Sequence, residues 1–328
     1  MAPARISRVR TLRQFTLLLL AAFFLTEVVV AKPSVDYSER LDALWDFDNP
    51  AASEARLRAE AARHRAQSRE AVEATTQVAR AQGLQRKFTD ADRTLDGVQR
   101  TLDTQPVRVR VRYLLERGRR DNSSQRRAPA VAWFEQALAA SAHDALAGAT
   151  YYRVDALHML AIASPPEQQL DFHKRAIAAA QAADDERTRG WRASLLHNLG
   201  WTMHDRGDDA AALDYWRQAL AAREAANDVP RARIARWTVA RGLRALGELD
   251  EAEAMQRALA DELQAANAPD GYVFEELAEI AVARGDRAAA QPWAAKALQL
   301  LGDDADMKAN EPARLARLAE LAQPVTRR

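Results

Sequence analysis

The chain contains 328 residues, of which 47 are Lys or Arg and 46 are Asp or Glu, with 12 Gly, 12 Pro and no Cys. The lack of cysteine excludes disulfides, thiolate metal sites, cysteine nucleophiles and a cysteine-linked lipid anchor. The formal net charge of +1 becomes −2 without residues 1–31, which carry four arginines and one glutamate, and a near-neutral protein gains little from long-range attraction to nucleic acid. Runs rich in Ala, Leu, Arg and Glu, with almost no alternating β-branched residues, predict helix nearly throughout and no sheet.

Residues 1–31 have the pattern of a targeting segment. Arginines precede an apolar run from Phe15 to Leu25, and a short stretch ending at Ala31 follows, which is the order of regions in a secretory signal peptide. Counting from Phe15 through Ala31 gives 17 residues, the lower limit for a membrane-spanning helix, and Glu27 would be costly inside one. We expect cleavage before Lys32 and export to the periplasm or cell envelope. The alternatives are an uncleaved inner-membrane anchor and a misassigned start codon on a cytoplasmic protein.

Residues 32–70 are expected to form an N-terminal helical cap. Asp48-Asn49-Pro50 predicts the start of a helix within it, because an Asn side chain caps free backbone N–H groups and Pro is favoured in the first helical turn.

A short motif recurs along the rest of the chain and indicates tandem repeats. A small residue there lets neighbouring helices pack closely, and the apolar residue after it fills the seam. Its alanines are 39, 43, 39 and 39 residues apart, and Arg100-Thr101-Leu102 resembles a degenerate first copy. Gly207, Gly247 and Gly285, which we place in turns, are separated by 40 and 38. The copies read Gln136-Ala137-Leu138, Arg175-Ala176-Ile177, Gln218-Ala219-Leu220, Arg257-Ala258-Leu259 and Lys296-Ala297-Leu298.

The stretch from Ser194 to Leu220 is the best-formed copy. Two helical segments meet at residues 205–208, and the pattern is carried by Leu199-Gly200, Gly207, Ala212, Trp216 and Ala219. It resembles the tetratricopeptide repeat (TPR) consensus, whose period is 34. The longer spacing here also admits HEAT-like repeats of about 40 to 47 residues. Glycine five residues before alanine, at 207 and 212 and again at 247 and 252, favours the TPR family.

The resemblance covers residues 71–304 and implies an all-α, right-handed α-solenoid of about six TPR-like helix hairpins. Asp121–Arg127 is expected to be a polar loop, and Pro165-Pro166 requires the preceding helix to end by Ser164. Residues 305–328 would be a C-terminal capping helix and tail, with Arg314, Arg317 and Glu320 of the helix Pro312–Leu321 facing water. The expected units are 71–106, 107–144, 150–185, 190–228, 231–267 and 270–304.

In this family the first helix of each hairpin lines a concave groove, with the second, fifth, ninth, twelfth and thirteenth places facing inward. In the unit at 190–228 these places are Ser194, His197, Trp201, His204 and Asp205. The wall is then aromatic and cationic in its middle and acidic toward its C-terminal end, which suits an extended peptide or a partner helix with acidic and apolar side chains. The candidate partner-binding residues are Arg80, Arg119, His158, His197, Asn198, Trp201, His204, Trp237, Arg241, Arg244, Tyr272, Glu275 and Glu279.

Several of these residues have an alternative interpretation. Trp201 and Trp237 could pack in the seams between units, and His158 or His197 could be hydrogen-bonded interior residues. Asn198 occupies a place where some TPR proteins grip the C-terminal carboxylate of a peptide, but the accompanying lysine and arginine positions are not reproduced in phase.

Catalytic and metal chemistry have little support in the sequence. His197 and His204 lie seven residues apart, about 10 Å along a helix, which is too far for both to bind one ion with bonds of about 2.0 to 2.1 Å. Phosphate-binding and nucleophile motifs are absent, so we predict no catalytic residue, cofactor or metal. The arginine-rich tract Arg108–Arg127 lacks interleaved aromatics and is expected to be the solvated face of a helix pair; binding of an anionic surface is the other reading.

These features together predict a non-catalytic scaffold that binds a protein or peptide partner along its concave groove. The alternative is a ligand-sensing or enzyme-associated regulatory module that binds a small molecule at the His/Trp/Arg part of the wall. No nucleic-acid partner is expected, and membrane contact would occur only through the N-terminal segment if it is not cleaved.

Overall fold

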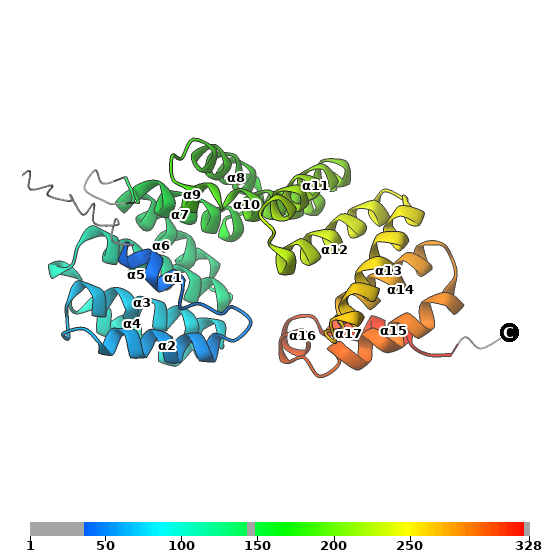
Figure 1. Ribbon diagram of the computed structural model, residues 1–328, viewed down its shortest axis with the longest axis horizontal. Helices are drawn as coiled ribbons and strands as arrows, with labels where there is room; N and C mark the ends of the chain where they lie inside the picture. The colour runs from blue at the N-terminus through cyan, green and yellow to red at the C-terminus, as the bar shows by residue number, and fades with distance from the viewer. Residues whose placement is uncertain (1–35, 143–147, 325–328) are drawn as a thin grey trace, which may run out of the picture.

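The computed structural model describes residues 36–142 and 148–324, and this part of the chain contains helices and no strand (Figure 1). The predictions for residues 1–31 lie outside it. Within the described ranges no helix combines the length and apolar character needed to cross a membrane. The elements are α1 (Tyr37–Asp42), α2 (Pro50–Ala62), α3 (Arg69–Leu84), α4 (Phe88–Gln99), η1 (Leu102–Thr104), α5 (Val107–Ser123), α6 (Arg127–Ala140), α7 (Ala149–Ala163), α8 (Pro166–Gln181), α9 (Glu186–Arg189), α10 (Arg192–Asp205), α11 (Asp209–Ala225), α12 (Val229–Ala245), α13 (Leu249–Ala265), α14 (Gly271–Ala283), α15 (Arg287–Leu301), α16 (Ala305–Asn310) and α17 (Pro312–Leu321).

The long helices form successive hairpins that stack into an arch (Figure 1). Within the later hairpins the chain reverses at Gly207, Gly247 and Gly285, whose φ angles are 80°, 81° and 77°. This left-handed conformation costs glycine little, because glycine has no Cβ. All three glycines lie in turns, as the sequence predicts. The first two hairpins turn instead through Arg86 and Gln125, with φ angles of 59° and 66°.

The ends of several helices follow local sequence signals. Asn49 precedes Pro50, and its side chain accepts a hydrogen bond of 3.0 Å from the Ala52 N–H. α7 ends at Ala163, one residue before Ser164, as Pro165-Pro166 requires. The expected polar loop 121–127 is wrong, because α5 continues to Ser123 and only residues 124–126 separate it from α6. The buried Asp121 carboxylate accepts a hydrogen bond from Trp133 Nε1 at 3.2 Å, which ties this end of α5 to α6.

Five of the second helices, α4, α6, α11, α13 and α15, bury three positions spaced four and then three residues apart, which form one face of a helix. In α11 these are Ala212, Trp216 and Ala219, all at most 1% exposed. Gln256 replaces Trp216 in the next hairpin, and its amide donates to the Trp237 carbonyl as the indole of Trp216 donates to that of His197. The other buried sets are Ala91, Leu95 and Val98; Ala130, Phe134 and Ala137; Ala252, Gln256 and Leu259; and Ala290, Ala294 and Ala297. In α8 the buried residues are instead His173, Ala176 and Ala180.

In two copies of the repeated motif, the predicted small residue is therefore not the buried one. Ala258 is exposed, and Leu259 occupies the buried place, because the repeat from Ala219 is 40 residues long instead of 39. Thr101 lies beyond the end of α4, and the buried residue is Val98. A shift of one residue turns a helical side chain by about 100°, which is enough to move Ala258 from the seam to the surface.

First helices approach second helices closely where glycine faces a large ring. A Cβ on Gly200 would lie 2.3 Å from Trp216 Nε1, and one on Gly118 would lie 2.3 Å from Phe134 Cε1. Glycine at these two places lets a fully buried indole and a fully buried phenyl ring fill the hairpin core. Trp216 is fully buried, whereas Trp201 and Trp237 are partly exposed; Trp237 also contacts the next unit, because its Nε1 donates to the Tyr272 carbonyl at 3.0 Å.

Candidate partner-binding groove

Side chains of the first helices meet along the inner side of the arch. Trp201 of α10 lies 6.2 Å from Trp237 of α12, measured between ring centroids, and Trp237 lies 6.2 Å from Tyr272 of α14. The Arg241 guanidinium lies 5.4 Å and 5.9 Å from the centroids of the two indoles, and that of Arg314 lies 5.1 Å from the Tyr272 ring. We call Trp201, Trp237, Arg241, Tyr272 and Arg314 the aromatic–arginine row. All five are partly exposed, so the row is a surface and not an interior cluster.

Arg241 is the least satisfied member of the row. Its carboxylate contact is Glu276, whose Oε2 lies 3.7 Å from the Arg241 Nη1, beyond hydrogen-bond distance. Among the residues that the structure describes, no acceptor bonds the buried Arg241 Nε. Burial lowers the pKa of Arg241, and Glu276 opposes this effect. Arg241 is therefore a partly exposed cation, stacked on two indoles and without a carboxylate at hydrogen-bond distance, and its exposed guanidinium edge can accept an anion from outside the chain.

The histidines of α10 support the aromatic–arginine row. His197 Nε2 accepts a hydrogen bond of 3.1 Å from Trp201 Nε1, which fixes the orientation of that indole. Burial lowers the pKa of His197 to about 4, with a smaller contribution from Arg223, so the ring is neutral and can accept. His204 instead lies 2.5 Å from Asp209, between its Nδ1 and Oδ1. The two histidines therefore have separate partners, and Asp205 is exposed.

Asn198 and His158 contact each other across neighbouring hairpins. The Asn198 amide nitrogen lies 3.4 Å from His158 Nε2. Burial lowers the pKa of His158 to about 4, so this ring is also neutral. The Arg119 guanidinium pairs with Glu116 at 2.7 Å and with Asp155. These three predicted site residues thus contribute to contacts between units.

The C-terminal end of the wall is not a free acidic surface, contrary to expectation. Arg314 bonds both carboxylate oxygens of Glu275 at 2.5 Å, and Arg317 bonds those of Glu279 at 2.5 and 2.8 Å. Arg244 pairs with Glu276, which is 1% exposed. The sequence places Arg314 on the outer side of α17, but it points into the groove, because α17 packs directly after α15 and brings its cations onto the α14 carboxylates.

The arginine-rich tract is not a solvated helix face either. Arg108 and Arg112 of α5 are buried, and both pair with Glu73 of α3, at 3.1 and 3.0 Å. Arg117 and Arg120 pair with carboxylates of α4. Five of the eight arginines in the tract are thus buried or half-buried in ion pairs within the chain, and only Arg110, Arg126 and Arg127 are exposed.

The N-terminal half of the groove is already occupied by the chain itself. The Arg80 guanidinium lies 5.3 and 5.5 Å from the ring centroids of Trp45 and Phe47, which stack on each other 5.0 Å apart. Asp36, which caps the start of α1, bonds Arg108, and Asp42, its last residue, bonds Arg187. The sequence pattern did not identify this segment because its helix, of six residues, is too short for a periodic signal.

The comparisons with known proteins concern the fold. The tetratricopeptide repeat model matches residues 192–229, the unit around Gly200 and Trp216. NprR in complex with its cognate peptide NprX is 15% identical, with 88% of this chain and 84% of that chain covered and a TM-score of 0.54. BtubC from P. vanneervenii is 17% identical, with 71% and 92% covered and a TM-score of 0.50. Cut9–Hcn1, an APC/C hetero-tetramer, is 10% identical, with 89% and 52% covered and a TM-score of 0.59. No curated protein matches.

The repeated buried sets, the left-handed turns and the small residues at hairpin contacts agree with these similarities. The described part of the chain is therefore a right-handed helical solenoid of tetratricopeptide-type hairpins, in which residues 192–229 match the repeat model itself.

Proposed function

We propose that the protein is a non-catalytic scaffold that binds a segment of another protein on the inner wall formed by α10, α12 and α14. The observation that supports this most directly is Arg241, a partly exposed cation stacked on Trp201 and Trp237 whose contact with Glu276, at 3.7 Å, is beyond hydrogen-bond distance. Arginine, tryptophan and tyrosine contribute most of the binding energy in many protein interfaces. NprR, whose fold is similar, has been solved with a peptide bound.

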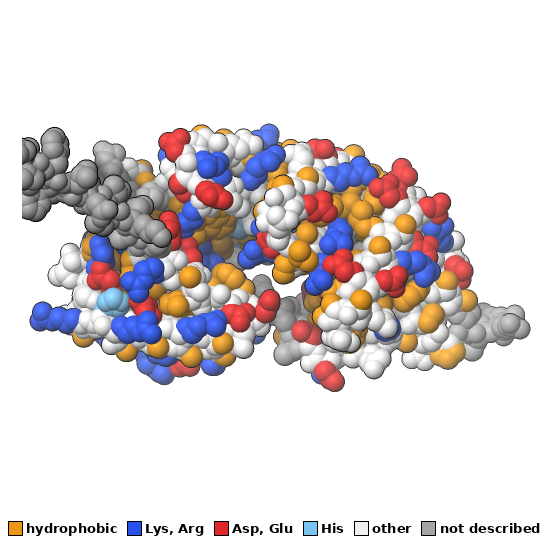
Figure 2. Space-filling model, viewed as in Figure 1, with side chains coloured by type: hydrophobic (Ala, Val, Ile, Leu, Met, Phe, Trp, Pro, Cys, Tyr) orange, Lys and Arg blue, Asp and Glu red, His pale blue; other side chains and the backbone are white. Residues whose placement is uncertain are grey.

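An apolar cavity of about 460 Å³ adjoins the aromatic–arginine row, between α12, α13 and α14. Ile234 at its edge is 55% exposed, and Val229 at the start of α12 is 48% exposed. Figure 2 shows hydrophobic side chains at the end of α12 that borders the hollow of the arch. The cavity can hold one large apolar side chain. Its apolar lining comes from Pro230, Ile234, Trp237, Leu259, Leu263 and Val273.

These two features define the chemistry of the partner. A carboxylate of the partner would bond Arg241, and a neighbouring apolar side chain would enter the cavity beside Trp237. The partner segment is therefore acidic and apolar, as an extended peptide or one face of a helix. A small anionic molecule bound by Arg241 alone would leave the cavity unused, so the peptide explains more of the wall.

A displayed random-peptide library tests this proposal. The library is selected on the full chain and counter-selected on Arg241→Gln; the recovered peptides are expected to combine an acidic residue with a large apolar one. Because a hydrogen bond to a charged group contributes about 1.5–3 kcal/mol, Arg241→Gln should weaken their binding by roughly ten- to a hundredfold. Arg217→Gln, on the outer helix α11 with its side chain 52% exposed, is the matched control and should bind normally.

Two outcomes would contradict the peptide-binding function. Recovered peptides that bind Arg241→Gln as tightly as the unaltered chain would show that the aromatic–arginine row is not the site. A library without binders, together with a small anion that raises the melting temperature of the unaltered chain and not that of Arg241→Gln, would favour the sensory module.

Export stays a prediction, and we propose that the mature chain begins at Lys32 in the periplasm or cell envelope. It rests on the order of charged and apolar residues in 1–31. N-terminal sequencing of the expressed protein checks it: a chain that begins at Lys32 supports export, and one that retains Met1 contradicts cleavage.

A further inference from the structure

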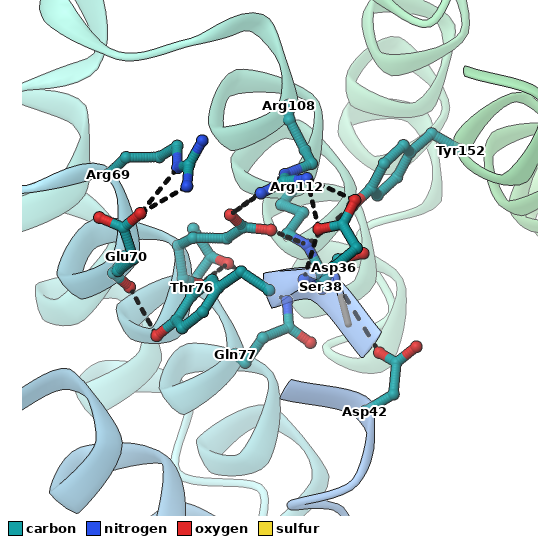
Figure 3. A network of polar contacts seen from close by, with 12 residues as sticks. Asp36, Ser38, Asp42, Arg69, Glu70, Thr76, Gln77, Arg108, Arg112 and Tyr152 are labelled. Atoms are coloured by element: carbon teal, nitrogen blue, oxygen red, sulfur yellow. Dashed lines mark hydrogen bonds and ion pairs between the residues drawn. The ribbon is translucent and has the colours of Figure 1, made fainter. Parts of the chain in front are cut away.

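The N-terminal segment, residues 36–47, lies on the inner wall of α3 and α5 (Figures 1 and 3). Leu41 is 0% exposed, Ser38 is 2% exposed and Tyr37 is 8% exposed, although α1 has only six residues. The Tyr37 hydroxyl donates to the Glu70 carbonyl at 3.1 Å. The segment therefore occupies the inner side of the arch, where a bound partner of a solenoid would lie.

The segment and this part of the wall have complementary charges. Around Asp36 and Asp42, five arginines of the wall face three of the wall's carboxylates, an excess of two positive charges within this set. Outside the set, Glu60 pairs with Arg40 of the segment and Asp185 lies near Arg187. Asp36 and Asp42 supply two negative charges. The Asp36 carboxylate bonds Arg108 Nη1 at 2.7 and 3.0 Å, and Asp42 accepts from Arg187 Nε at 2.8 Å. The arginines are Arg80, Arg108, Arg112, Arg119 and Arg187, and the carboxylates of the wall are Glu73, Glu116 and Asp155.

Burial makes this complementarity important. The side chains of Arg108 and Arg112 are 10% and 6% exposed, and that of Glu73, which lies between them, is 0% exposed. A buried cation without a partner is costly, so this wall requires an acidic occupant. The whole segment suits it, with four acidic residues, one basic residue and three aromatic ones among residues 36–47.

The contacts that hold the segment are nevertheless limited. Asp36 and Asp42 each have side chains 39% exposed, and Phe47 is 49% exposed. Leu41 and Tyr37 enter the apolar core around Leu57, Ala74 and Val78, whereas Leu44 and Trp45 pack against it while partly exposed. A short helix held by half-exposed ion pairs and few apolar contacts opens more readily than the hairpins it covers.

We propose that the N-terminal segment is an exchangeable occupant of this wall, and that a partner segment of the same chemistry binds there by displacing it. The partner would carry two carboxylates about 9 Å apart along a helix, with an aromatic residue and a leucine between them. The covalent link gives the segment a high effective concentration, so a free competitor binds weakly until the segment opens. This inference is independent of the proposed function, because it concerns α3, α5 and α9 and not α10–α14.

The absence of cysteine allows a direct test of segment opening in the full chain. Ser38→Cys places one thiol under the segment, and Thr238→Cys places one at a 0% exposed position of α12. Without denaturant, a thiol reagent should modify Ser38→Cys at least about ten times faster than Thr238→Cys, since local opening precedes global unfolding.

A peptide of residues 36–47 tests displacement in the same experiment. It should accelerate modification of Ser38→Cys in a dose-dependent way, and a peptide with both Asp36→Asn and Asp42→Asn should not. In the full chain the same two substitutions should tighten binding of the unaltered peptide at least about tenfold, because the covalent competitor is weakened.

Two results would overturn the inference. If Ser38→Cys and Thr238→Cys react at the same rate, the segment opens only when the protein unfolds. If Ser38→Cys reacts faster but peptide at millimolar concentration leaves its rate unchanged, the segment frays and the wall accepts no outside segment. Both readings use a chain with intact aspartates, so they do not depend on how well the double variant folds.

Discussion

Replacing Gly200 with alanine is expected to destabilise the protein, although alanine normally favours a helix. A Cβ on Gly200 would lie 2.3 Å from Trp216 Nε1 and 2.4 Å from its Cδ1, much closer than atoms tolerate. The indole cannot move away freely, because its Nε1 donates to the His197 carbonyl at 3.0 Å. On the far side of the ring, a Cβ on Gly242 would lie 3.0 Å from Trp216 Cε3, so a second helix is already close.

The expected loss in the free energy of unfolding follows from three contributions. Alanine in place of glycine gains about 1 kcal/mol of helix propensity. Overpacking a filled core costs about 1–3 kcal/mol, and a buried hydrogen bond broken by the displaced indole costs about 1–3 kcal/mol more. The net loss is therefore roughly 1–5 kcal/mol. Gly83→Ala in α3 is the matched control; no atom lies within 4 Å of its added Cβ, so it should stabilise by about 0.5–1 kcal/mol.

Urea unfolding followed by far-UV circular dichroism measures both variants. The midpoint should fall for Gly200→Ala and rise for Gly83→Ala. In a chain that already carries Trp216→Leu, adding Gly200→Ala should recover part of the stability that Trp216→Leu removed, because the smaller leucine leaves room for the methyl group. Equal stabilisation by both alanines, or no favourable coupling in the double variant, would refute the close packing of α10 against α11.

Three further predictions concern other parts of the solenoid. Burial lowers the pKa of His173 from 6.5 to about 4, so stability that is present at pH 7 is lost as the pH falls from 6.5 toward 4. Between pH 7 and 5 this ring should account for a loss of about 2 kcal/mol in the free energy of unfolding. His173→Asn should reduce the measured loss by that amount. Arg314→Ala leaves Glu275, which is 6% exposed, without its bidentate partner and should lower the free energy of unfolding in urea by roughly 3 kcal/mol. Arg317→Ala, at a side chain that is 51% exposed, should lower it by less than about 1 kcal/mol. Ala258→Arg should leave the melting temperature nearly unchanged, while Ala297→Arg, at a position 0% exposed, should prevent folding; similar behaviour of both would contradict the register of the second helices.

The sequence by itself determined the features that depend on neighbours within one turn or one hairpin. Helix starts such as Asn49-Pro50, the stop before Pro165 and the turn glycines all act through local backbone geometry, so their residue types identify them. The repeat of small residues with Gly200 and Ala212 identified hairpins stacked in tandem, because each hairpin must bury one face against the next.

Only the tertiary structure decided which surfaces meet. The register of α13 changed by one residue because the unit before it is longer, and a pattern that tolerates units of variable length cannot detect that change. Asp42 bonds Arg187 across 145 positions of the chain, and Arg314 bonds Glu275 across 39. Such pairs depend on the curvature that accumulates over several hairpins, and no local pattern encodes it. For the same reason, arginines expected to be exposed on α5 and α17 became paired arginines of the groove, while Arg241 lacks a carboxylate at hydrogen-bond distance.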